Sequence, residues 1–328
     1  MTPGSPAAML ILKPNGGTWR GRCMKESQQA WWARGEGLEP VRCAVVHPCE
    51  AGALRGALEA GQVGLIVPIL VGPENRIREL ARSEGIDLSG TELVHAPFSH
   101  AAAEIAVALA VQGQVEALMK GSLHTDELMH AALAERNFRT KRRLSHVFRF
   151  EVPLYDKPLL ITDAALNIRP SLAEKVDIVQ NAILLAQILG VETPKVAILS
   201  AVETVNPAIP STLDAAALCK MADRGQITGA VLDGPLAFDS AISREAAAIK
   251  QIQSPVSGLA DILVVPDLES GNMLAKQLEY LAGGSASGVV LGGRVPVALT
   301  SRADGAQARI GSALLAKLVA HHHRHHTP

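Results

Sequence analysis

The chain has 328 residues, 48% of them hydrophobic and 19% charged, which is typical of a globular α/β protein with two domains or lobes. Its 31 basic and 32 acidic residues give a formal net charge of -1, which excludes a global field that would recruit nucleic acid or an acidic membrane. No apolar run reaches the roughly 18 residues of a membrane helix. The four cysteines form no Cys-x-x-Cys pair, so we expect a cytoplasmic protein with reduced thiols.

Residues 1–36 predict an irregular N-terminal extension. They contain all three tryptophans, and their apolar run over residues 9–12 is too short for the core of a signal peptide. Lys13 and Pro14 follow this run at once. We therefore expect the folded part of the chain to begin at about residue 37.

From about residue 42, short apolar runs alternate with stretches of helical periodicity. Buried strands separated by helices imply βαβ units and a mostly parallel sheet. In the first half of the chain we predict strands over residues 43–46, 65–71, 92–95 and 115–119. Helices are predicted over residues 52–60, 74–83 and 101–111.

Two prolines interrupt this alternation near residues 148–158, which predicts a domain boundary, and a second boundary is expected near residues 292–300. Ser171 and Glu174 have the spacing of a capping box, and Gly190 is expected to end the helix that they open. Further strands are predicted over residues 159–162, 196–199, 230–232, 262–265, 288–291 and 295–299. Further helices are predicted over residues 173–189, 211–222, 244–252, 270–281 and 306–320.

The most informative polar segment follows the last predicted strand and runs from Thr300 to Asp304. Ligands of open α/β sheets bind on the loops beyond the carboxyl ends of the strands. Arg302 could hold phosphate oxygens with two hydrogen bonds, and the N-terminus of the next helix adds donors and a partial positive charge. In the alternative interpretation, Asp304 only caps the last helix, and Thr300 or Ser301 satisfies the turn before it.

Lys120, Gly121 and Ser122 end another predicted strand. Glycine lets the backbone approach an anion, lysine supplies a charge and serine a hydroxyl, so this turn is a candidate phosphate site. The segment lacks the G-x-x-x-x-G-K pattern of a nucleotide-binding P-loop. An ordinary strand-to-helix turn is therefore the alternative.

Gly271 and Asn272 begin a predicted helix that continues through Lys276, and a nucleotide pyrophosphate would suit that N-terminus. Here the alternative is that Ser270 is a plain N-cap. Ser145 precedes an apolar strand and adds a hydroxyl beside the imidazole of residue 146, although a lone histidine is more often structural.

Several enzyme signatures are absent from the sequence. There is no G-x-G-x-x-G dinucleotide fingerprint, no G-x-S-x-G elbow and no H-E-x-x-H helix, which argues against a covalent acyl-enzyme and against zinc. The histidine-rich segment 321–326 could chelate a metal, but ligands in a flexible run lack supporting hydrogen bonds, so a solvated tail is the preferred interpretation. The residues alone thus indicate an anion-binding α/β enzyme.

Several longer motifs add a more specific signal: LMKG (118–121), LSHV (144–147), LITDAALN (160–167), PKVAILSAVE (194–203), VNP (205–207), QITGAVLDGPLA (226–237), ADILVVP (260–266), SGN (270–272) and LTSRAD (299–304). With these motifs in this order, the chain resembles the phosphate acetyl/butyryltransferase family from about residue 118 to residue 318, and more closely its butyryl-type branch. Residues 37–117 fit the family more loosely, and residues 1–36 do not fit it.

The resemblance implies two α/β/α lobes with mostly parallel sheets, similar to isocitrate dehydrogenase, with the active site in the cleft between the lobes. Residues 37–148 and 297–320 would form the first lobe and residues 149–296 the second. Residues 1–36 would be the extension and residues 321–328 a histidine-rich tail. It also implies a homodimer without a metal or other cofactor, whose substrates are coenzyme A and phosphate.

The implied reaction is reversible transfer of a short acyl group, acetyl or butyryl, between coenzyme A and inorganic phosphate, by direct attack of the thiolate on the acyl phosphate. Ser301 and Arg302 match the family's catalytic pair. Acetyl-type members carry an acidic residue several positions later, where this chain has glutamine and alanine, so Asp304 is the candidate base. The other candidates are Lys120, Gly121, Ser122, Ser145 and Arg302 for phosphate, and Gly271, Asn272 and Lys276 for coenzyme A.

Two alternatives of other classes stay open. A NAD-dependent dehydrogenase of similar fold would be favoured by a dinucleotide fingerprint, which the sequence lacks. A non-catalytic regulatory protein that binds coenzyme A would not need the retained Ser301 and Arg302. The preferred acyl chain stays open as well, because the depth of the pocket depends on tertiary packing.

Overall fold

The computed structural model describes residues 31–300, 305–326 and 328. The strands are β1 Val41–Val46, β2 Ile66–Gly72, β3 Glu92–His95, β4 Ala117–Lys120, β5 Ser145–Glu151, β6 Leu159–Thr162, β7 Lys195–Leu199, β8 Val231–Leu236, β9 Ile262–Val264, β10 Ser285–Leu291 and β11 Val297–Ala298. The helices are α2 Ala51–Gln62, α3 Glu74–Ser83, α4 Ser99–Val111, α5 Thr125–Ala134, α6 Leu172–Ile188, α7 Pro210–Asp223, α8 Phe238–Ile242, α9 Arg244–Ile249, α10 Leu268–Tyr280 and α11 Ala306–His323.

These strands form one 11-stranded sheet in the order β3-β2-β1-β4-β11-β10-β5-β6-β9-β7-β8. On one side of the centre, β3, β2, β1, β4 and β11 are parallel, and on the other side β6, β9, β7 and β8 are parallel. The central strands β10 and β5 pair antiparallel with each other and with their outer neighbours. The prediction of a mostly parallel sheet is therefore confirmed, and an antiparallel centre joins its two halves.

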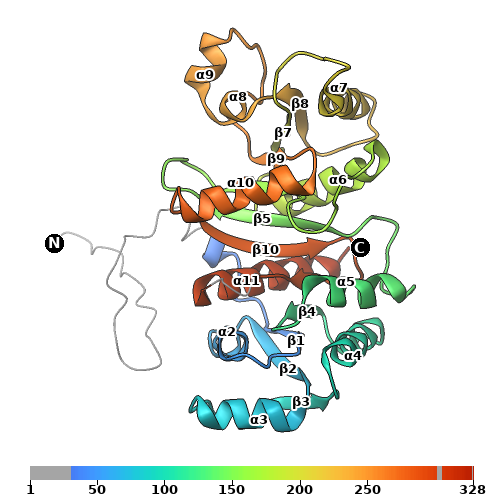
Figure 1. Ribbon diagram of the computed structural model, residues 1–328, viewed down its shortest axis with the longest axis vertical. Coiled ribbons are helices and arrows are strands. Elements are labelled where there is room, and N and C mark those ends of the chain that lie inside the picture. The colour runs from blue at the N-terminus through green and yellow to red at the C-terminus, as the bar shows by residue number, and fades with distance from the viewer. Residues whose placement is uncertain (1–30, 301–304, 327) are drawn as a thin grey trace, which may run out of the picture.

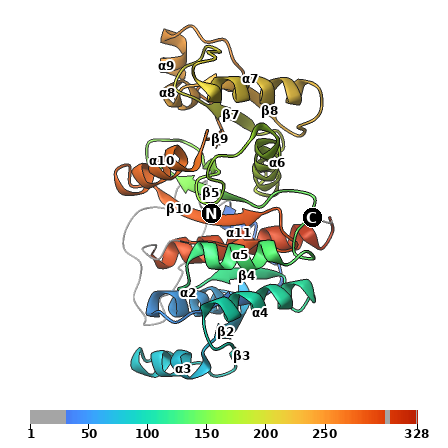
Figure 2. The ribbon, with the colours of Figure 1, turned by 45° about the vertical axis from the view of Figure 1, so that its right-hand side comes forward.

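Helices cover both faces of the sheet (Figures 1 and 2). On one face a continuous hydrophobic core runs beneath α2, α3, α11, α6 and α7. On the other face the core is divided into one cluster beneath α4 and α5 and a second beneath α8 and α10. The division into two lobes by residue number remains a prediction, but the second face has an interruption at which a ligand site can form.

Helix α11 lies in the middle of the molecule, between the two halves (Figure 1). It packs on α2, β4 and β10, so the end of the chain returns to the first half of the fold. Helix α6 begins with the predicted capping box. The Ser171 hydroxyl accepts from the Glu174 N–H, and the Glu174 carboxylate accepts from the Ser171 N–H. Helices α5 and α8 were not among the predicted elements.

Both ends of the described chain differ from the sequence expectations. Trp31, which falls in the predicted extension, is buried, and the Arg149 guanidinium lies 4.1 Å from the centroid of its ring. At the other end α11 extends beyond the predicted residue 320, and His321 Nε2 lies 2.8 Å from the Glu39 carbonyl oxygen. Arg324 pairs with Glu116 at 2.6 Å. The expectation of a solvated tail therefore does not hold for residues 321–323, which belong to α11, whereas Arg324 is exposed.

Candidate active site

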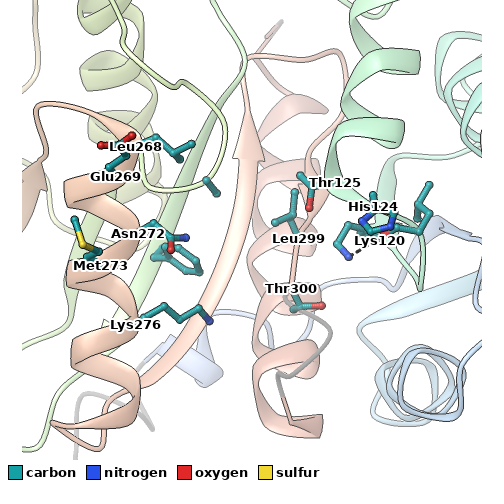
Figure 3. A pocket seen from close by; sticks show the side chains of 13 residues that line it. Lys120, His124, Thr125, Leu268, Glu269, Asn272, Met273, Lys276, Leu299 and Thr300 are labelled. Carbon is teal, nitrogen blue, oxygen red and sulfur yellow. Dashed lines mark hydrogen bonds between the residues drawn. The ribbon is translucent and has the colours of Figure 1, made fainter.

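A cavity of about 770 Å³ lies where the core of the second face divides (Figure 3). One wall comes from the end of β4 and the start of α5, and the opposite wall comes from α10. The end of β11 and the middle of β5 lie between these walls. The lining residues are Lys120, Leu123, His124, Thr125, Phe148, Ala165, Leu268, Glu269, Asn272, Met273, Lys276, Leu299 and Thr300.

The β4 wall is held by close backbone packing. A Cβ on Gly121 would lie 2.7 Å from the His47 carbonyl oxygen and still closer to that of Val46, so only glycine fits there. Ser122 Oγ donates to the His47 carbonyl oxygen at 2.7 Å and accepts from the Cys49 N–H at 3.0 Å. The hydroxyl predicted to bind phosphate thus holds the turn together, and Lys120 is the member of the predicted trio that lines the cavity.

The ammonium group of Lys120 has little freedom. Its side chain is 4% exposed, and Nζ lies 3.2 Å from the Leu123 carbonyl oxygen. A buried ammonium at the wall of a cavity is well placed to bind an anionic ligand there.

Helix α10 forms the second wall, and its N-cap is Asp267, whose carboxylate accepts from the Ser270 N–H at 2.9 Å. The alternative that Ser270 is the N-cap is therefore wrong. Gly271 is buried, and a Cβ there would lie 3.0 Å from that of Ala164, so this glycine lets α10 approach the loop after β6. Gly271 does not line the cavity. It serves the packing of the helix.

Asn272 and Lys276 lie on the side of α10 that lines the cavity (Figure 3). Asn272 Nδ2 lies 3.4 Å from the Ala164 carbonyl oxygen. Lys276 Nζ pairs with Glu279 at 2.8 Å and lies 5.6 Å from the centroid of the Tyr280 ring. Two of the three residues predicted for coenzyme A thus share the cavity with Lys120.

Ser145 is fully buried and does not line the cavity. Its hydroxyl accepts from Asn181 Nδ2 of α6 at 2.8 Å. Successive side chains of a strand point to opposite faces, and this position of β5 faces α6 rather than the cavity. The placement of Ser145 thus gives no support to the predicted contact with phosphate.

His146 is fully buried on the other face of β5, and its ring packs edge-on against Phe148 with centroids 4.3 Å apart. Burial lowers the pKa of His146 to about 4, against a smaller opposing effect of Asp163. The imidazole is therefore neutral at pH 7 and acts as packing beneath the cavity.

Asp163 and Asn167 support this region rather than lining it, whereas Ala165 between them lines the cavity. The Asp163 carboxylate accepts from the backbone N–H groups of His146, Ala165 and Leu166 at 2.9–3.0 Å. It also accepts from Asn167 Nδ2 at 2.6 Å. These bonds tie the loop after β6 to β5 and so fix the floor of the cavity.

Ser301, Arg302 and Asp304 lie outside the described residues. Thr300, the residue before Ser301 in the chain, lines the cavity, and its Oγ1 accepts from Arg309 Nη1 at 3.2 Å. The chain therefore reaches this predicted catalytic segment directly from the cavity.

Sequence reasoning did not find the contributions of His124, Thr125, Phe148, Glu269 and Met273 to the lining. The start of α5 did carry a signal, because Asp126 and Glu127 place two acidic residues in the first turn of a helix. Phe148 carried no such signal, because a phenylalanine in an apolar strand is most simply a core residue.

The cavity combines a buried lysine on one wall, a lysine on the opposite wall and apolar side chains between them. Such a lining suits a ligand with negative charges at its ends and an aliphatic part between. Among residues 31–300, 305–326 and 328, no three histidine, cysteine, aspartate or glutamate side chains come together in a way that could hold a metal ion. Within the same ranges, no helix is both long and apolar enough to cross a membrane.

Comparison with known proteins gives one consistent result. Residues 96–317 match the family model described as Phosphate acetyl/butaryl transferase. The chain is 59% identical over 282 residues to a phosphate acetyltransferase from Rhizobium meliloti, covering 86% of this chain and 89% of that protein. It is 42% identical over 283 residues to a phosphate butyryltransferase from Clostridium acetobutylicum, covering 86% of this chain and 94% of that protein.

The fold resembles that of a branched-chain phosphotransacylase from Enterococcus faecalis V583. The two structures have a TM-score of 0.75 and 32% sequence identity, covering 86% of this chain and 99% of that chain. The resemblance to the family is thus confirmed. Its motifs indicated the butyryl-type branch, whereas the higher of the two sequence identities is to a protein named as an acetyltransferase.

Proposed function

Because the chain belongs to the phosphate acetyl/butyryltransferase family and is an acyltransferase, we propose that it moves an acetyl group reversibly between coenzyme A and inorganic phosphate. The choice of acetyl is supported by the 59% identity to a phosphate acetyltransferase, against 42% to a phosphate butyryltransferase. The single observation that carries the proposal is the cavity, which has Lys120 and Lys276 on opposite walls and Thr300 on the segment between them.

In this proposal Lys120 faces the phosphate and Lys276 and Asn272 face coenzyme A. The β4 wall suits inorganic phosphate because its lysine is buried and its backbone is tightly packed. The wall formed by α10 suits the larger nucleotide part of coenzyme A, because one exposed helix face can adapt to an extended ligand. The apolar side chains between the walls would surround the acyl group and the end of the pantetheine arm.

The chemical step is direct transfer. In the direction of acetyl-CoA formation, the coenzyme A thiolate attacks the carbonyl carbon of acetyl phosphate, a carbon–sulfur bond forms, and the carbon–oxygen bond to phosphate breaks. The tetrahedral oxyanion would accept a hydrogen bond from Ser301, and Arg302 would hold the departing phosphate. Asp304 is the carboxylate we assign to the thiol proton, and because a free thiol has a pKa of about 8.5, a modest base is sufficient near pH 7.

We further propose that the enzyme works as a homodimer in the cytoplasm and needs neither a metal nor an organic cofactor. The family resemblance supports the homodimer and the lack of a cofactor, and the pattern of cysteines in the sequence supports the cytoplasm. Catalysis would then rest on holding two substrates together in one cavity and on hydrogen bonds to the developing charges.

The test is an assay of thiol release from acetyl-, propionyl- and butyryl-CoA at millimolar phosphate. We expect phosphate-dependent release of coenzyme A, fastest with acetyl-CoA, without added metal or nicotinamide. The Arg302→Lys variant keeps the charge but loses the two-point hydrogen bonding of a guanidinium. The loss of transition-state stabilisation should be about 2–4 kcal/mol, and kcat should fall accordingly. The matched control is Arg224→Lys, at the exposed end of α7.

Activity only with a nicotinamide dinucleotide would favour a dehydrogenase instead. Binding of coenzyme A without turnover of any of the three thioesters would favour a regulatory protein. Normal turnover in the Arg302→Lys variant would remove this residue from the mechanism.

A further inference from the structure

A buried guanidinium of α11 lies behind Thr300. Arg309 is 7% exposed, and its Nη1 donates to Thr300 Oγ1 at 3.2 Å. Two glycines of α2, one helical turn apart, make room for this side chain. A Cβ on Gly56 would lie 2.5 Å from Arg309 Cδ, and one on Gly52 would lie 3.8 Å from Arg309 Nη2. Because burying a cation is costly unless it is hydrogen-bonded, α2 and Thr300 are fitted to an arginine at this position.

Thr300 and Lys120 lie at the same edge of the sheet. Strand β11 runs parallel to β4, with Ala298 opposite Met119, so the two residues follow neighbouring strands that are about 5 Å apart. Thr300 is 5% exposed, and both residues line the cavity. In Figure 3 the Thr300 hydroxyl is directed toward the side of the cavity on which Lys120 lies. One wall of the cavity thus presents a hydroxyl together with an ammonium group.

The bond from Arg309 determines what the Thr300 hydroxyl can do. It uses a lone pair of Oγ1, and the hydroxyl proton can still be donated to an acceptor in the cavity. A hydroxyl that accepts from a cation becomes a stronger donor, because hydrogen bonds in a chain polarise one another. Threonine is also branched at Cβ, which restricts rotation of its side chain. Thr300 is therefore oriented as a donor before a ligand arrives, and an anion is the acceptor that suits it best.

We propose that Thr300 donates a hydrogen bond to the phosphate that Lys120 binds, and that Arg309 is the residue that positions this hydroxyl. The inference rests on the proposed function of the same cavity. Arg309 does not line the cavity, so it acts on the phosphate through the Thr300 hydroxyl rather than by contact. Helix α10 forms the opposite wall, so the Thr300 hydroxyl should affect the use of phosphate and not the binding of acetyl-CoA.

The test compares Thr300→Val, which replaces the hydroxyl by a methyl group, with Thr300→Ser, which keeps the hydroxyl. Initial rates of coenzyme A release are measured with phosphate varied and then with acetyl-CoA varied. Thr300→Val should lower kcat/KM for phosphate about 10- to 100-fold, the loss expected for a hydrogen bond to a charged group. It should leave the KM for acetyl-CoA within about twofold of the wild type, and Thr300→Ser should keep most of the activity.

The matched control is Thr212→Val, which removes a hydroxyl from a fully buried threonine of α7. Thr212 Oγ1 lies 2.9 Å from the Asn206 carbonyl oxygen and 2.7 Å from that of Ile209. This residue does not line the cavity. The control should therefore lower the melting temperature and leave the KM values for phosphate and acetyl-CoA unchanged.

The Arg309→Lys variant tests the positioning role, and it keeps the inference testable if Thr300→Val does not fold. Lysine keeps the charge but loses the guanidinium fork, so kcat/KM for phosphate should fall as in Thr300→Val, by a smaller factor. The double variant should lose less than the product of the two separate losses, because both residues act through one hydroxyl.

An active wild type whose kinetics for phosphate do not change in folded Thr300→Val would overturn the inference alone. Equal losses in Thr300→Val and Thr300→Ser would do the same, because the hydroxyl could then not be the cause. Losses that simply multiply in the double variant would remove the positioning role of Arg309. A wild type without phosphate-dependent release of coenzyme A would overturn the proposed function and this inference with it.

Discussion

The two walls of the cavity present a lysine in opposite ways. On the β4 wall, Lys120 is 4% exposed and extends from a turn in which Gly121 and Ser122 are both fixed by backbone contacts. On the α10 wall, Lys276 stands on the face of a single helix beside Met273, whose side chain is 65% exposed. One wall is thus set by the packing of the main chain, and the other consists of side chains that can change rotamer.

This difference indicates a division of work between the two walls. A small anion of fixed shape is bound best by groups that do not have to reorganise when it arrives. A long ligand with several rotatable bonds is accommodated by side chains that can adjust to it. Substitutions on the β4 wall should therefore affect the rate and the fold, and substitutions on the α10 wall should affect mainly affinity.

The largest effect is expected for Lys120→Met, which keeps the length of the side chain but removes its charge. If Lys120 stabilises charge on the transferred phosphate, kcat should fall about 100- to 1,000-fold, which is the loss seen when a single transition-state donor is removed. Steady-state kinetics beside a melting curve would separate this from a structural effect. A variant with a lowered melting temperature but normal kcat would give the lysine a structural role only.

Acid should destabilise the protein through the buried histidine beneath the floor. The folded-state pKa of His146 is about 4, below its ordinary value of 6.5, so the unfolded chain binds more protons between these pH values. The free energy of unfolding should therefore fall as pH drops from 6.5 to 4, by at most about 3 kcal/mol for this group. Denaturant titrations should show a shallower loss in a His146→Leu variant. If the free energy of unfolding depended on pH in the same way in the wild type and in the His146→Leu variant, the loss could not be assigned to His146.

The Gly121→Ala variant tests the rigid wall directly. The added methyl group would meet two carbonyl oxygens of the β1–α2 connection, so we expect the free energy of unfolding to fall by about 1–3 kcal/mol. Gly52→Ala is the matched control, because a Cβ there would meet only Arg309, at an ordinary 3.8 Å, and alanine favours the helix. Equal stability of the two variants would show that the turn can relax.

The smallest effect is expected on the adaptable wall. Lys276→Ala should raise the KM for coenzyme A by about tenfold, or about 1.4 kcal/mol, with little change in kcat, because neighbouring side chains can replace part of the contact. Lys220→Ala is a matched control, because Lys220 also pairs with an acidic residue three positions later but lies on α7, away from the cavity. A large fall in kcat for Lys276→Ala would mean that both walls take part in the chemistry.

Sequence periodicity predicted most of this fold, because the buried strands and the amphipathic helices have distinct patterns. The bounds of α3 and β3 agree with the prediction residue for residue. The same reasoning placed Lys120 at the end of a strand, Thr300 on the loop after the last strand, and Asn272 at the start of a helix that continues through Lys276. The structure brings all four residues to one cavity.

The positions of the other predicted site residues depend on tertiary packing. Ser145 looked like a ligand-binding hydroxyl, but which face of β5 it occupies depends on a register with β10, a strand far away in the sequence. Ser122 was predicted to bind phosphate and Gly271 to bind coenzyme A, yet their contacts are with backbone and neighbouring loops. No local pattern distinguishes a residue that binds a ligand from one that supports the loop beside it.

The position of β10 and β11 at the centre of the sheet has a consequence for biosynthesis. The ribosome makes β1 to β9 first, yet β4 pairs with β11 and β5 pairs with β10 in the finished sheet. Until residues 285–298 emerge, the two halves of the nascent chain each present an unpaired strand edge, and such edges are sites of aggregation. Translation that stops shortly before β10 should therefore yield an insoluble product rather than a shortened enzyme. Pairing of the late strands β10 and β11 thus completes the fold of the whole chain.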